Sequence, residues 1–240
     1  MNLVVALSLL PFFMFFSKDD PYRMAAVKAL EEAIPKELLE ENAAWYEAWK
    51  ASGYDQEIYM PSYFSQRDNK SGQGHRECFS SAAAMISAYY GKVSSDDEYN
   101  KIREKFGDTT SVTAQLETLQ SLGLTAEFRQ DADADMVERQ LELGRPVLMG
   151  YLSAGNFLRG EPAMCDSVGC GHWLVVNGYR GKNSADPQWV VHDPNGFPEL
   201  ETGGHSGHLS GKNVTIRQAL MNERWQVGGT KTGWVIFVHD

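Results

Sequence analysis

RECFSSAAAMISAYYG, from Arg76 to Gly91, is the stretch of this 240-residue sequence that says most about the fold. Between Cys78 and Tyr90 it is rich in Ala, Ser and Met. Small side chains let a helix pack closely against its neighbours, so the stretch predicts a helix in the middle of a domain. Cys78 stands at the start of the predicted helix, where the positive end of the helix dipole would point at its sulfur.

Two predicted strands further along the chain carry a histidine and an aspartate at their ends. HWLVVNGYR begins with His172, and QWVVHD ends with Asp193 at an Asp-Pro-Asn-Gly turn. Adjacent antiparallel strands can bring these two side chains together. Asp193 would then accept the ring N–H of His172 and hold the imidazole in the tautomer that a thiol nucleophile requires.

A cysteine, a histidine and an aspartate in this arrangement favour an enzyme with a thiolate nucleophile. Taken singly, Cys78 is more simply explained as a small buried apolar side chain, and Asp193 as a turn residue. The three together favour catalysis, with Cys78 as nucleophile, His172 as base and Asp193 as the group that orients the base. His192 precedes Asp193, and because side chains alternate along a strand we expect it to face away, as a structural or surface residue.

Catalysis by a thiolate also needs hydrogen-bond donors for the negative oxygen of the tetrahedral intermediate. The backbone N–H of Cys78, at the helix start, is one candidate. The other is a side-chain amide upstream, for which the sequence offers Gln66 and Gln73. We favour Gln66, because it follows an extended segment that would fix its position, whereas Gln73 lies in a glycine-containing loop.

The order of these residues resembles that of papain-like cysteine peptidases, and most of all their bacteriocin-processing branch, which cleaves after double-glycine leaders. Four motifs carry the resemblance: Tyr-Phe-Ser-Gln ending at Gln66, the Ala-rich helix after Cys78, Gly-His-Trp at His172 and Asp-Pro at Asp193. The resemblance covers Tyr59 to Asp240. It implies a papain-like fold with a Cys78–His172–Asp193 triad, and it places Gln66 in the oxyanion hole.

The sequence departs from that branch directly after the nucleophile. Relatives commonly have Cys-Gly-Pro-Thr there, whereas this chain has Cys-Phe-Ser-Ser, from Cys78 to Ser81. Because Phe79 would narrow the site, we do not expect specificity for double-glycine leaders. No transporter segments follow the domain, so a role in bacteriocin export is not expected either.

The rest of the sequence predicts an α+β fold in which helices come first and an antiparallel sheet follows. Periodicity and capping residues predict helices at 94–106, 109–122, 131–144 and 215–223. Apolar and β-branched runs predict strands at 124–129, 145–152, 172–180, 188–193 and 233–239. Three parts are expected: an apolar N-terminal segment at 1–20, a helical appendage at 21–54 and a papain-like peptidase domain at 55–240.

The N-terminal run from Leu3 to Phe16 is almost entirely apolar, but it is too short to span a bilayer comfortably. No Lys or Arg precedes it, and no cleavage site of small residues follows it. Three interpretations stay open: an export signal or membrane anchor, an arm that docks into a partner chain of an assembly, or a segment packed against its own fold. We therefore expect a secreted, membrane-anchored or particle-associated protein rather than a cytoplasmic one.

The other two cysteines, Cys165 and Cys170, lie close enough in sequence to form a local disulfide, which would leave Cys78 as the free thiol. Three reduced cysteines are an equally good interpretation. His205 and His208 have H-x-x-H spacing and, together with the cysteine pair, would make up a zinc ligand set. No sequence feature brings these segments together, so a solvated or substrate-contacting histidine loop is the expectation.

The aspartates of DADADMVERQLELG imitate the first positions of a calcium-binding loop, at Asp131, Asp133 and Asp135. Met136 stands where such a loop needs its turn-forming glycine, and the segment has helical periodicity. We expect acidic helix capping here, and neither a metal nor a cofactor anywhere in the chain.

Charge and composition exclude some classes of partner. The chain has 22 basic and 32 acidic residues, a formal net charge of -10, and its Lys and Arg are not clustered. Binding to phosphate backbones needs clustered cations, so nucleic acid is not an expected partner. Electrostatic docking to anionic membranes is not expected for the same reason.

The favoured hypothesis is a cysteine peptidase that hydrolyses amide bonds of a protein or of a cell-wall peptide through an acyl-enzyme. A phage or bacterial hydrolase that degrades peptidoglycan is a sub-case that fits the apolar N-terminus. The alternative is a non-catalytic structural or assembly protein, for example of a phage particle, that uses a peptidase-like fold. Acyl transfer to an amine would use the same triad.

Overall fold

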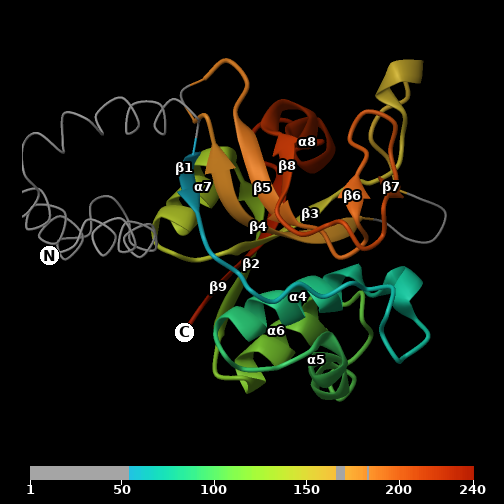
Figure 1. Ribbon diagram of the computed structural model, residues 1–240, viewed down its shortest axis with the longest axis vertical. Helices are drawn as coiled ribbons and strands as arrows, with labels where there is room; N and C mark the ends of the chain where they lie inside the picture. Colours follow the sequence, from blue (N-terminus) through green and yellow to red (C-terminus); the bar gives the residue numbers. More distant parts are fainter. Residues whose placement is uncertain (1–53, 166–170, 183) are drawn as a thin grey trace, which may run out of the picture.

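The computed structural model describes residues 54–165, 171–182 and 184–240 (Figure 1). The predicted apolar segment at 1–20 and nearly all of the helical appendage at 21–54 lie outside the described residues, as does Cys170, one of the two cysteines considered for a local disulfide. Among the described residues, no helix has both the length and the apolar character needed to cross a membrane.

A seven-stranded antiparallel sheet forms the centre of the described part. Six of its strands lie in the order β2-β9-β3-β4-β5-β8. The seventh, β1, pairs with the end of β4, past the residues of β4 that pair with β3. The strands are β1 (Tyr54–Glu57), β2 (Thr125–Ala132), β3 (Val147–Tyr151), β4 (His172–Arg180), β5 (Gln188–His192), β8 (Val214–Arg217) and β9 (Gly233–His239). A separate two-stranded hairpin is formed by β6 (Phe197–Pro198) and β7 (His205–Ser206).

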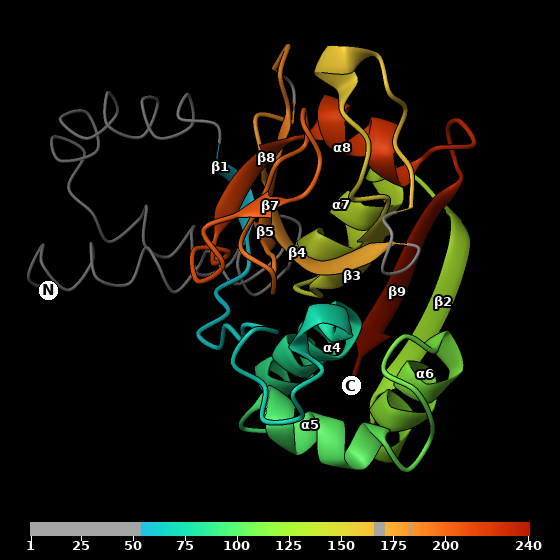
Figure 2. The same cartoon turned by 90° about the vertical axis from the view of Figure 1, so that its right-hand side faces the viewer.

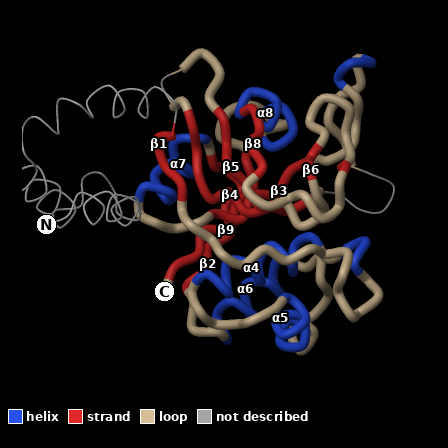
Figure 3. The backbone as a smooth tube through the Cα atoms, in the orientation of Figure 1, coloured by secondary structure: helices blue, strands red, loops and turns tan. Residues whose placement is uncertain are grey.

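The helices lie on two sides of this sheet. Figures 1 and 2 show one group of helices below it and a second group on its opposite side, and Figure 3 shows the same separation of helix and strand. The lower group is α4 (Cys78–Tyr89), α5 (Asp96–Arg103) and α6 (Val112–Ser121), and the upper pair is α7 (Ala134–Glu142) and α8 (Gln218–Trp225). Two short 3-10 helices, η1 (Gly74–Arg76) and η2 (Phe157–Arg159), lie in loops. The predicted α+β class is confirmed.

Helix α4 is the central element that its composition predicts. Every residue from Phe79 to Ser87 is buried, and the helix packs on β4 and β3. With α4 on one side and α7 and α8 on the other, β3 is buried along its whole length and β4 over all but its last residue. Burial on both faces explains why these two strands are apolar runs rather than alternating sequences.

Local capping chemistry sets the start of the other predicted helices. The side chains of Ser95, Ser111 and Asp133 each accept a hydrogen bond from a backbone N–H of the first turn. Such caps satisfy amides that have no acceptor within the helix. Asp133 is therefore a helix cap. Asp131 forms a surface ion pair with Arg129, at 2.7 Å.

One predicted helix is wrong at its start. We expected a helix over 215–223, but Val214–Arg217 is strand β8, and the helix begins only at Gln218. The β-branched residues here pair with β5, from Trp189 opposite Ile216 to Val191 opposite Val214. Tertiary pairing decides such short segments, because strand preference reflects packing on a neighbouring strand more than local propensity.

The predicted domain boundary stays a prediction. Strand β1 begins at Tyr54 and pairs with the end of β4, with Tyr54 opposite Arg180. The chain has thus entered the central sheet at the edge of the described residues.

Candidate active site

A cleft of about 620 Å³ opens where the start of α4 meets the start of β4. Cys78 and His172, which begin these two elements, both line it, and so does Gln66. The cleft therefore brings together side chains from the helical part and from the sheet, at the junction of the two groups of elements.

Cys78 is a free, half-buried thiol at the first position of α4. Glu77, immediately before it, is almost fully buried, and its Oε2 accepts hydrogen bonds from Asn69 Nδ2 at 2.8 Å and Ser71 Oγ at 2.7 Å. These bonds tie the preceding polar loop to the helix start. The first amides of α4, including that of Cys78, have no acceptor within the helix and face the same end as the thiol.

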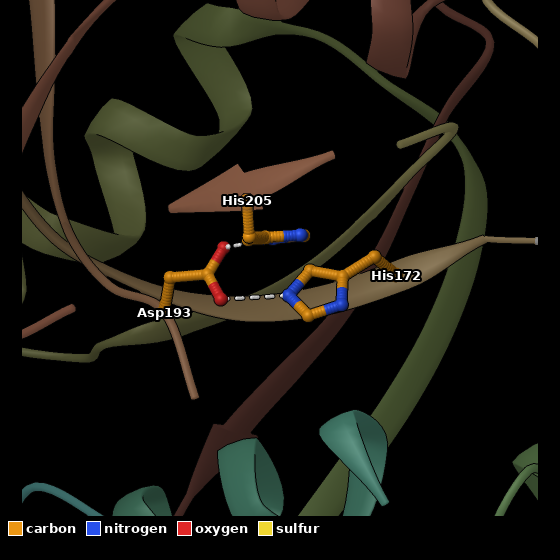
Figure 4. A group of neighbouring side chains, drawn as sticks. All are labelled: His172, Asp193 and His205. Carbon is orange, nitrogen blue, oxygen red and sulfur yellow. Dashed lines mark hydrogen bonds and ion pairs between the residues drawn. The ribbon is translucent and has the colours of Figure 1, made fainter. Parts of the chain in front are cut away.

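His172 and Asp193 meet as the strand pattern predicts. His172 begins β4, Asp193 follows the last residue of β5, and β4 and β5 pair antiparallel. His172 Nε2 lies 2.8 Å from Asp193 Oδ1 (Figure 4). Cys78 lines the same cleft as His172, and its electrostatic interaction with the ring helps to raise the pKa of His172, so the two side chains are neighbours. Since Nε2 contacts the carboxylate, Nδ1 is the ring nitrogen that remains for the thiol.

The carboxylate of Asp193 is fully buried, and both of its oxygens are engaged. Oδ1 accepts the backbone N–H of Asn195 at 2.8 Å in addition to its contact with His172. Oδ2 lies 3.3 Å from the Tyr151 hydroxyl and 3.2 Å from His205 Nε2. A buried carboxylate with several donors has little freedom to rotate, so it holds the His172 ring in one orientation.

The backbone of Asp193 is held as firmly as its side chain. Its N–H donates to Gly211 O at 2.8 Å, and its carbonyl accepts the Tyr63 hydroxyl at 2.8 Å. A side chain at Gly211 would collide with the Asp193 carbonyl, since an added Cβ would lie 1.9 Å from that oxygen. Glycine is therefore required where the chain passes the candidate triad.

The charges in this cluster perturb one another strongly. Burial lowers the pKa of His172, but the charges and hydrogen bonds of Asp193 and Cys78 outweigh it and raise that pKa from 6.5 to about 10. Burial raises the pKa of Asp193, but His172 and His205 outweigh it and hold that pKa well below its usual value. The arrangement thus stabilises a protonated imidazole beside an ionised carboxylate.

Gln66 also lies where the sequence places it. Its side chain lines the cleft and is almost fully buried, and its backbone N–H donates to Pro194 O at 2.9 Å. Nε2 donates one hydrogen to Gly74 O at 2.6 Å, which leaves the second hydrogen of the amide. Gln73, the other amide considered, is exposed and does not line the cleft.

His205 is a site residue that sequence reasoning missed. We expected it in a solvated or substrate-contacting loop, but its side chain is only 5% exposed and its ring centroid lies 4.3 Å from that of His172. Figure 4 shows the Asp193 carboxylate beside the two imidazoles, with one of its oxygens directed to each. Burial and the nearby charge of His172 lower the pKa of His205, so it is the neutral member of the pair. No local pattern in the Gly- and Ser-rich stretch indicates this contact.

His208 and His192 have structural partners. His208 is turned to Asn195 O, 3.0 Å from Nδ1, so the two histidines of the H-x-x-H pair do not converge on one point. His192 is fully buried, with Met60 O 3.3 Å from Nε2 and the Asn213 N–H donating to Nδ1. The prediction that His192 is structural and points away from Asp193 agrees with these contacts.

Among the described residues, one group of three could hold a metal ion, and it is His172, Asp193 and His205, whose ligand atoms lie within 4.8 Å of one another. The contacts of 2.8 Å and 3.2 Å that join the carboxylate to the two rings are ordinary hydrogen-bond distances. Each of the three side chains therefore already has a hydrogen-bond partner within the group.

Phe79 forms part of the cleft wall instead of projecting into the open space. It is 1% exposed and stacks face to face on Trp173, with ring centroids 4.0 Å apart and an interplanar angle of 3°. Gly150 makes room for this pair, because a Cβ there would lie 2.9 Å from the Trp173 ring. The residue that departs from the bacteriocin-processing pattern thus makes an aromatic wall beside Cys78.

Comparison with known proteins adds a family to this geometry. No curated protein sequence matches the chain. Among solved structures, the peptidase domain of Streptococcus ComA, a bi-functional ABC transporter involved in quorum sensing, is 19% identical, covers 68% of this chain and 91% of that chain, and has a TM-score of 0.43. A double glycine motif protease from an AMS/PCAT transporter, in complex with the leader peptide, is 17% identical, with coverages of 78% and 96% and a TM-score of 0.44. A C39-like peptidase from Bacillus anthracis is 13% identical, with coverages of 77% and 98% and a TM-score of 0.48.

The family comparison is the decisive one. The model of the Peptidase_C39 like family matches residues 60–202, which is more than half of the chain and includes Gln66, Cys78, His172 and Asp193. The chain therefore belongs to the Peptidase_C39 like family.

Proposed function

We propose that this protein is a cysteine peptidase that hydrolyses amide bonds through a covalent acyl-enzyme. The observation that carries the proposal is the position of the His172 ring, which lines one cleft together with the Cys78 thiol and lies 2.8 Å from the buried Asp193 carboxylate. A thiol at a helix start, an imidazole and a carboxylate gathered at one open cleft are the groups that nucleophilic catalysis needs.

The first chemical step is attack by sulfur. A protonated His172 beside Cys78 stabilises the thiolate as an ion pair, and Asp193 stabilises the imidazolium. The thiolate adds to the carbonyl carbon of the substrate, a C–S bond forms, and the carbonyl π electrons move to oxygen. The resulting tetrahedral intermediate carries a negative oxygen next to the first amides of α4.

The second step expels the amine. Once sulfur is bonded to carbon, the Cys78 charge that helped to raise the pKa of His172 is gone. His172 therefore becomes a stronger acid when it must protonate the leaving nitrogen. The C–N bond breaks, the amine departs, and the thioester remains on Cys78. Neutral His172 then removes a proton from water, whose oxygen attacks the thioester carbon. The C–S bond breaks, the carboxylic acid product leaves, and the thiolate is regenerated beside the protonated His172.

Gln66 and the backbone amide of Cys78 are the proposed donors to the negative oxygen. Replacing Gln66 with alanine is expected to lower kcat about 10²- to 10³-fold, the usual cost of losing one such donor. Because Nε2 also holds Gly74 O, loop damage must be separated from the loss of a donor. Alkylation of Cys78 by iodoacetamide should keep its wild-type rate in Gln66→Ala, and Gln73→Ala should keep full activity. Equal turnover in Gln66→Ala and wild type would remove Gln66 from the mechanism.

His205 is proposed to position Asp193 and not to touch the substrate. In His205→Ala, Oδ2 of Asp193 loses one donor. We therefore expect kcat to fall about 10- to 100-fold with little change in KM, the usual cost of losing a residue that orients a functional side chain through a hydrogen bond. His205→Gln, which keeps an N–H donor, should recover part of the loss. The pH profile of kcat separates this role from simple destabilisation, because a misplaced carboxylate changes the ionisation of His172. An unchanged profile with unchanged kcat would mean that Tyr151 and Asn195 are enough to hold the Asp193 carboxylate in place.

The proposed substrate is a protein or the peptide of a bacterial cell wall, met outside the cytoplasm if the apolar N-terminal segment directs the chain there. The test is to incubate the full chain with a mixed peptide library and with cell-wall peptides, and to identify new termini by mass spectrometry. Intact-mass analysis after acid quench should detect an acyl adduct on wild type. Cys78→Ala should give neither new termini nor adduct. Wild type that is as inert as Cys78→Ala on every substrate would favour a non-catalytic assembly role instead.

A further inference from the structure

The cleft carries positive charge although the chain as a whole is acidic. The sequence has 32 acidic and 22 basic residues. Among the described residues that line the cleft, however, none is Asp or Glu, whereas Arg67, Arg76 and several histidines are present. The Asp193 carboxylate lies beneath this surface, fully buried. A substrate that enters the cleft therefore meets cations and polar groups without a competing surface carboxylate.

Arg67 is the cation of this wall whose charge is not compensated within the described part of the chain. Its Nε donates to Asn195 Oδ1 at 2.7 Å, and Asn195 is neutral. Arg76, by contrast, is paired with Asp108 at 2.9 Å, and the surface arginines Arg129 and Arg217 are paired with carboxylates in the same way. A guanidinium has five N–H donors in a fixed plane, so the contact with Asn195 leaves the terminal amino groups of Arg67 for a ligand.

The contact with Asn195 also fixes Arg67 relative to the candidate triad. Asn195 donates its backbone N–H to Asp193 Oδ1 at 2.8 Å, and its carbonyl lies 3.0 Å from His208 Nδ1. Arg67 directly follows Gln66, the proposed oxyanion donor, and its charge helps to lower the pKa of His205. The guanidinium thus stands at the wall of the cleft that includes the oxyanion donor and the Asp193 turn.

We propose that this cleft selects a peptide substrate that carries a carboxylate close to the scissile bond, bound by the terminal amino groups of Arg67. The proposal rests on the proposed peptidase function and adds its substrate class, an acidic peptide. Planar guanidinium and carboxylate groups match each other in two parallel N–H···O bonds, which gives geometric selection as well as attraction. A chain of net charge -10 repels acidic peptides at long range, so their selection requires a local cation of this kind.

The charge at the nucleophile can be tested without any peptide. Cys78 is alkylated by iodoacetate, which is anionic, and by iodoacetamide, which is neutral and of almost the same size. The ratio of the two rates reports the local potential and cancels differences in thiol reactivity. Arg67→Ala is expected to lower the ratio of iodoacetate to iodoacetamide about fivefold at low ionic strength, and added salt should lower the wild-type ratio toward that of the variant. Arg129→Ala, which removes the same charge from a residue outside the cleft wall, should leave the ratio unchanged.

Substrate selection is tested with two pools of quenched fluorescent peptides that differ only in Glu or Gln at the positions flanking the central bond. Wild type should cleave the Glu pool with a kcat/KM about fivefold higher than that for the Gln pool. Arg67→Ala should lose the preference, and Arg67→Glu should reverse it in favour of a matching Lys pool. Two results together would overturn the inference: cleavage of the Glu and Gln pools at equal rates, and the same alkylation ratio in wild type and Arg67→Ala. They would leave the peptidase proposal intact. If no pool is cleaved but the ratio still depends on Arg67, the anion site stands and the peptidase proposal fails.

Discussion

Replacing His172 with alanine is expected to lower kcat/KM for amide hydrolysis by about 10⁴-fold or more, because the residues of a catalytic triad act as a unit. The ring lines the cleft with Cys78 and lies 2.8 Å from Asp193 Oδ1, so its removal leaves the proposed nucleophile without its base and the buried carboxylate without this partner. It also removes the acid that must protonate the leaving amine. Hydrolysis of whichever peptide the wild type cleaves is the measurement, with folding checked by circular dichroism.

The same variant is expected to change how Cys78 alkylation depends on pH. In wild type, Asp193 and Cys78 raise the pKa of His172 to about 10 against the opposing effect of burial, so the imidazolium persists through neutral pH. Its charge would stabilise the thiolate, so iodoacetamide should label wild type faster than His172→Ala between about pH 6 and pH 8. In His172→Ala, labelling should rise about tenfold per pH unit over that range, as it does for an ordinary thiol.

A histidine outside the cleft provides the control. His239, near the C-terminus, should be replaceable by alanine without any effect on labelling. If wild type and His172→Ala give the same pH profile, Cys78 is an ordinary thiol and the peptidase proposal is wrong.

The ionisation of His172 also contributes to the stability of the fold. Its folded-state pKa is raised, so this contribution is complete below about pH 6.5 and is lost as the pH rises toward 10.

Replacing Arg224 with methionine is expected to destabilise the fold by about 3–5 kcal/mol, the usual cost of removing one member of a buried charged hydrogen-bond network. Arg224 is 1% exposed and lies on α8. Its guanidinium donates to four backbone carbonyls: Leu152 at 3.1 Å, Ala154 at 2.8 Å, Gly155 at 2.7 Å and Leu200 at 2.7 Å. It also stacks over the Phe157 ring, 4.3 Å from the centroid. Methionine fills similar volume but leaves these carbonyls without their donor.

Urea unfolding monitored by tryptophan fluorescence measures this effect. The matched control is Arg217→Met, because Arg217 is about half exposed and pairs with Asp186 at 3.0 Å, so its loss should cost less than about 1 kcal/mol. The loop that Arg224 holds includes Ser153 and Ala154, which line the cleft, so activity should fall together with stability. A loss of stability in Arg224→Met no larger than that in Arg217→Met would show that water replaces the donor at little cost.

Local sequence rules were sufficient for much of the fold and for the placement of Cys78, His172 and Asp193. The small residues after Cys78 specify a buried helix, and capping by Ser95, Ser111 and Asp133 sets where other helices begin. These features depend on neighbours within one turn. The meeting of His172 with Asp193 was also predictable, because both stand at the ends of apolar strands that pair antiparallel.

Contacts made between distant segments needed the tertiary structure. His205 reaches Asp193 because the β6–β7 hairpin brings the chain back to the turn that follows β5, and its Gly- and Ser-rich sequence contains no periodicity that would indicate this. The start of α8 was misplaced because pairing of β8 with β5, and not local propensity, makes 214–217 a strand. From the sequence alone, Arg224 would be taken for a surface residue of a short helix. Its burial and its four carbonyl partners depend on how α8 packs.

Sequence patterns were enough to propose Cys78 as nucleophile, His172 as base and Asp193 as orienting carboxylate, and to predict the α+β plan, since each follows from periodicity, capping or turn chemistry within a few residues. Three features became visible only in the folded chain: a second histidine shares the carboxylate, Arg67 has no compensating carboxylate among the described residues, and a buried arginine holds the cleft wall. Hydrogen bonds and charges act through space over a few ångströms. Which distant side chains come that close depends on how the whole chain packs.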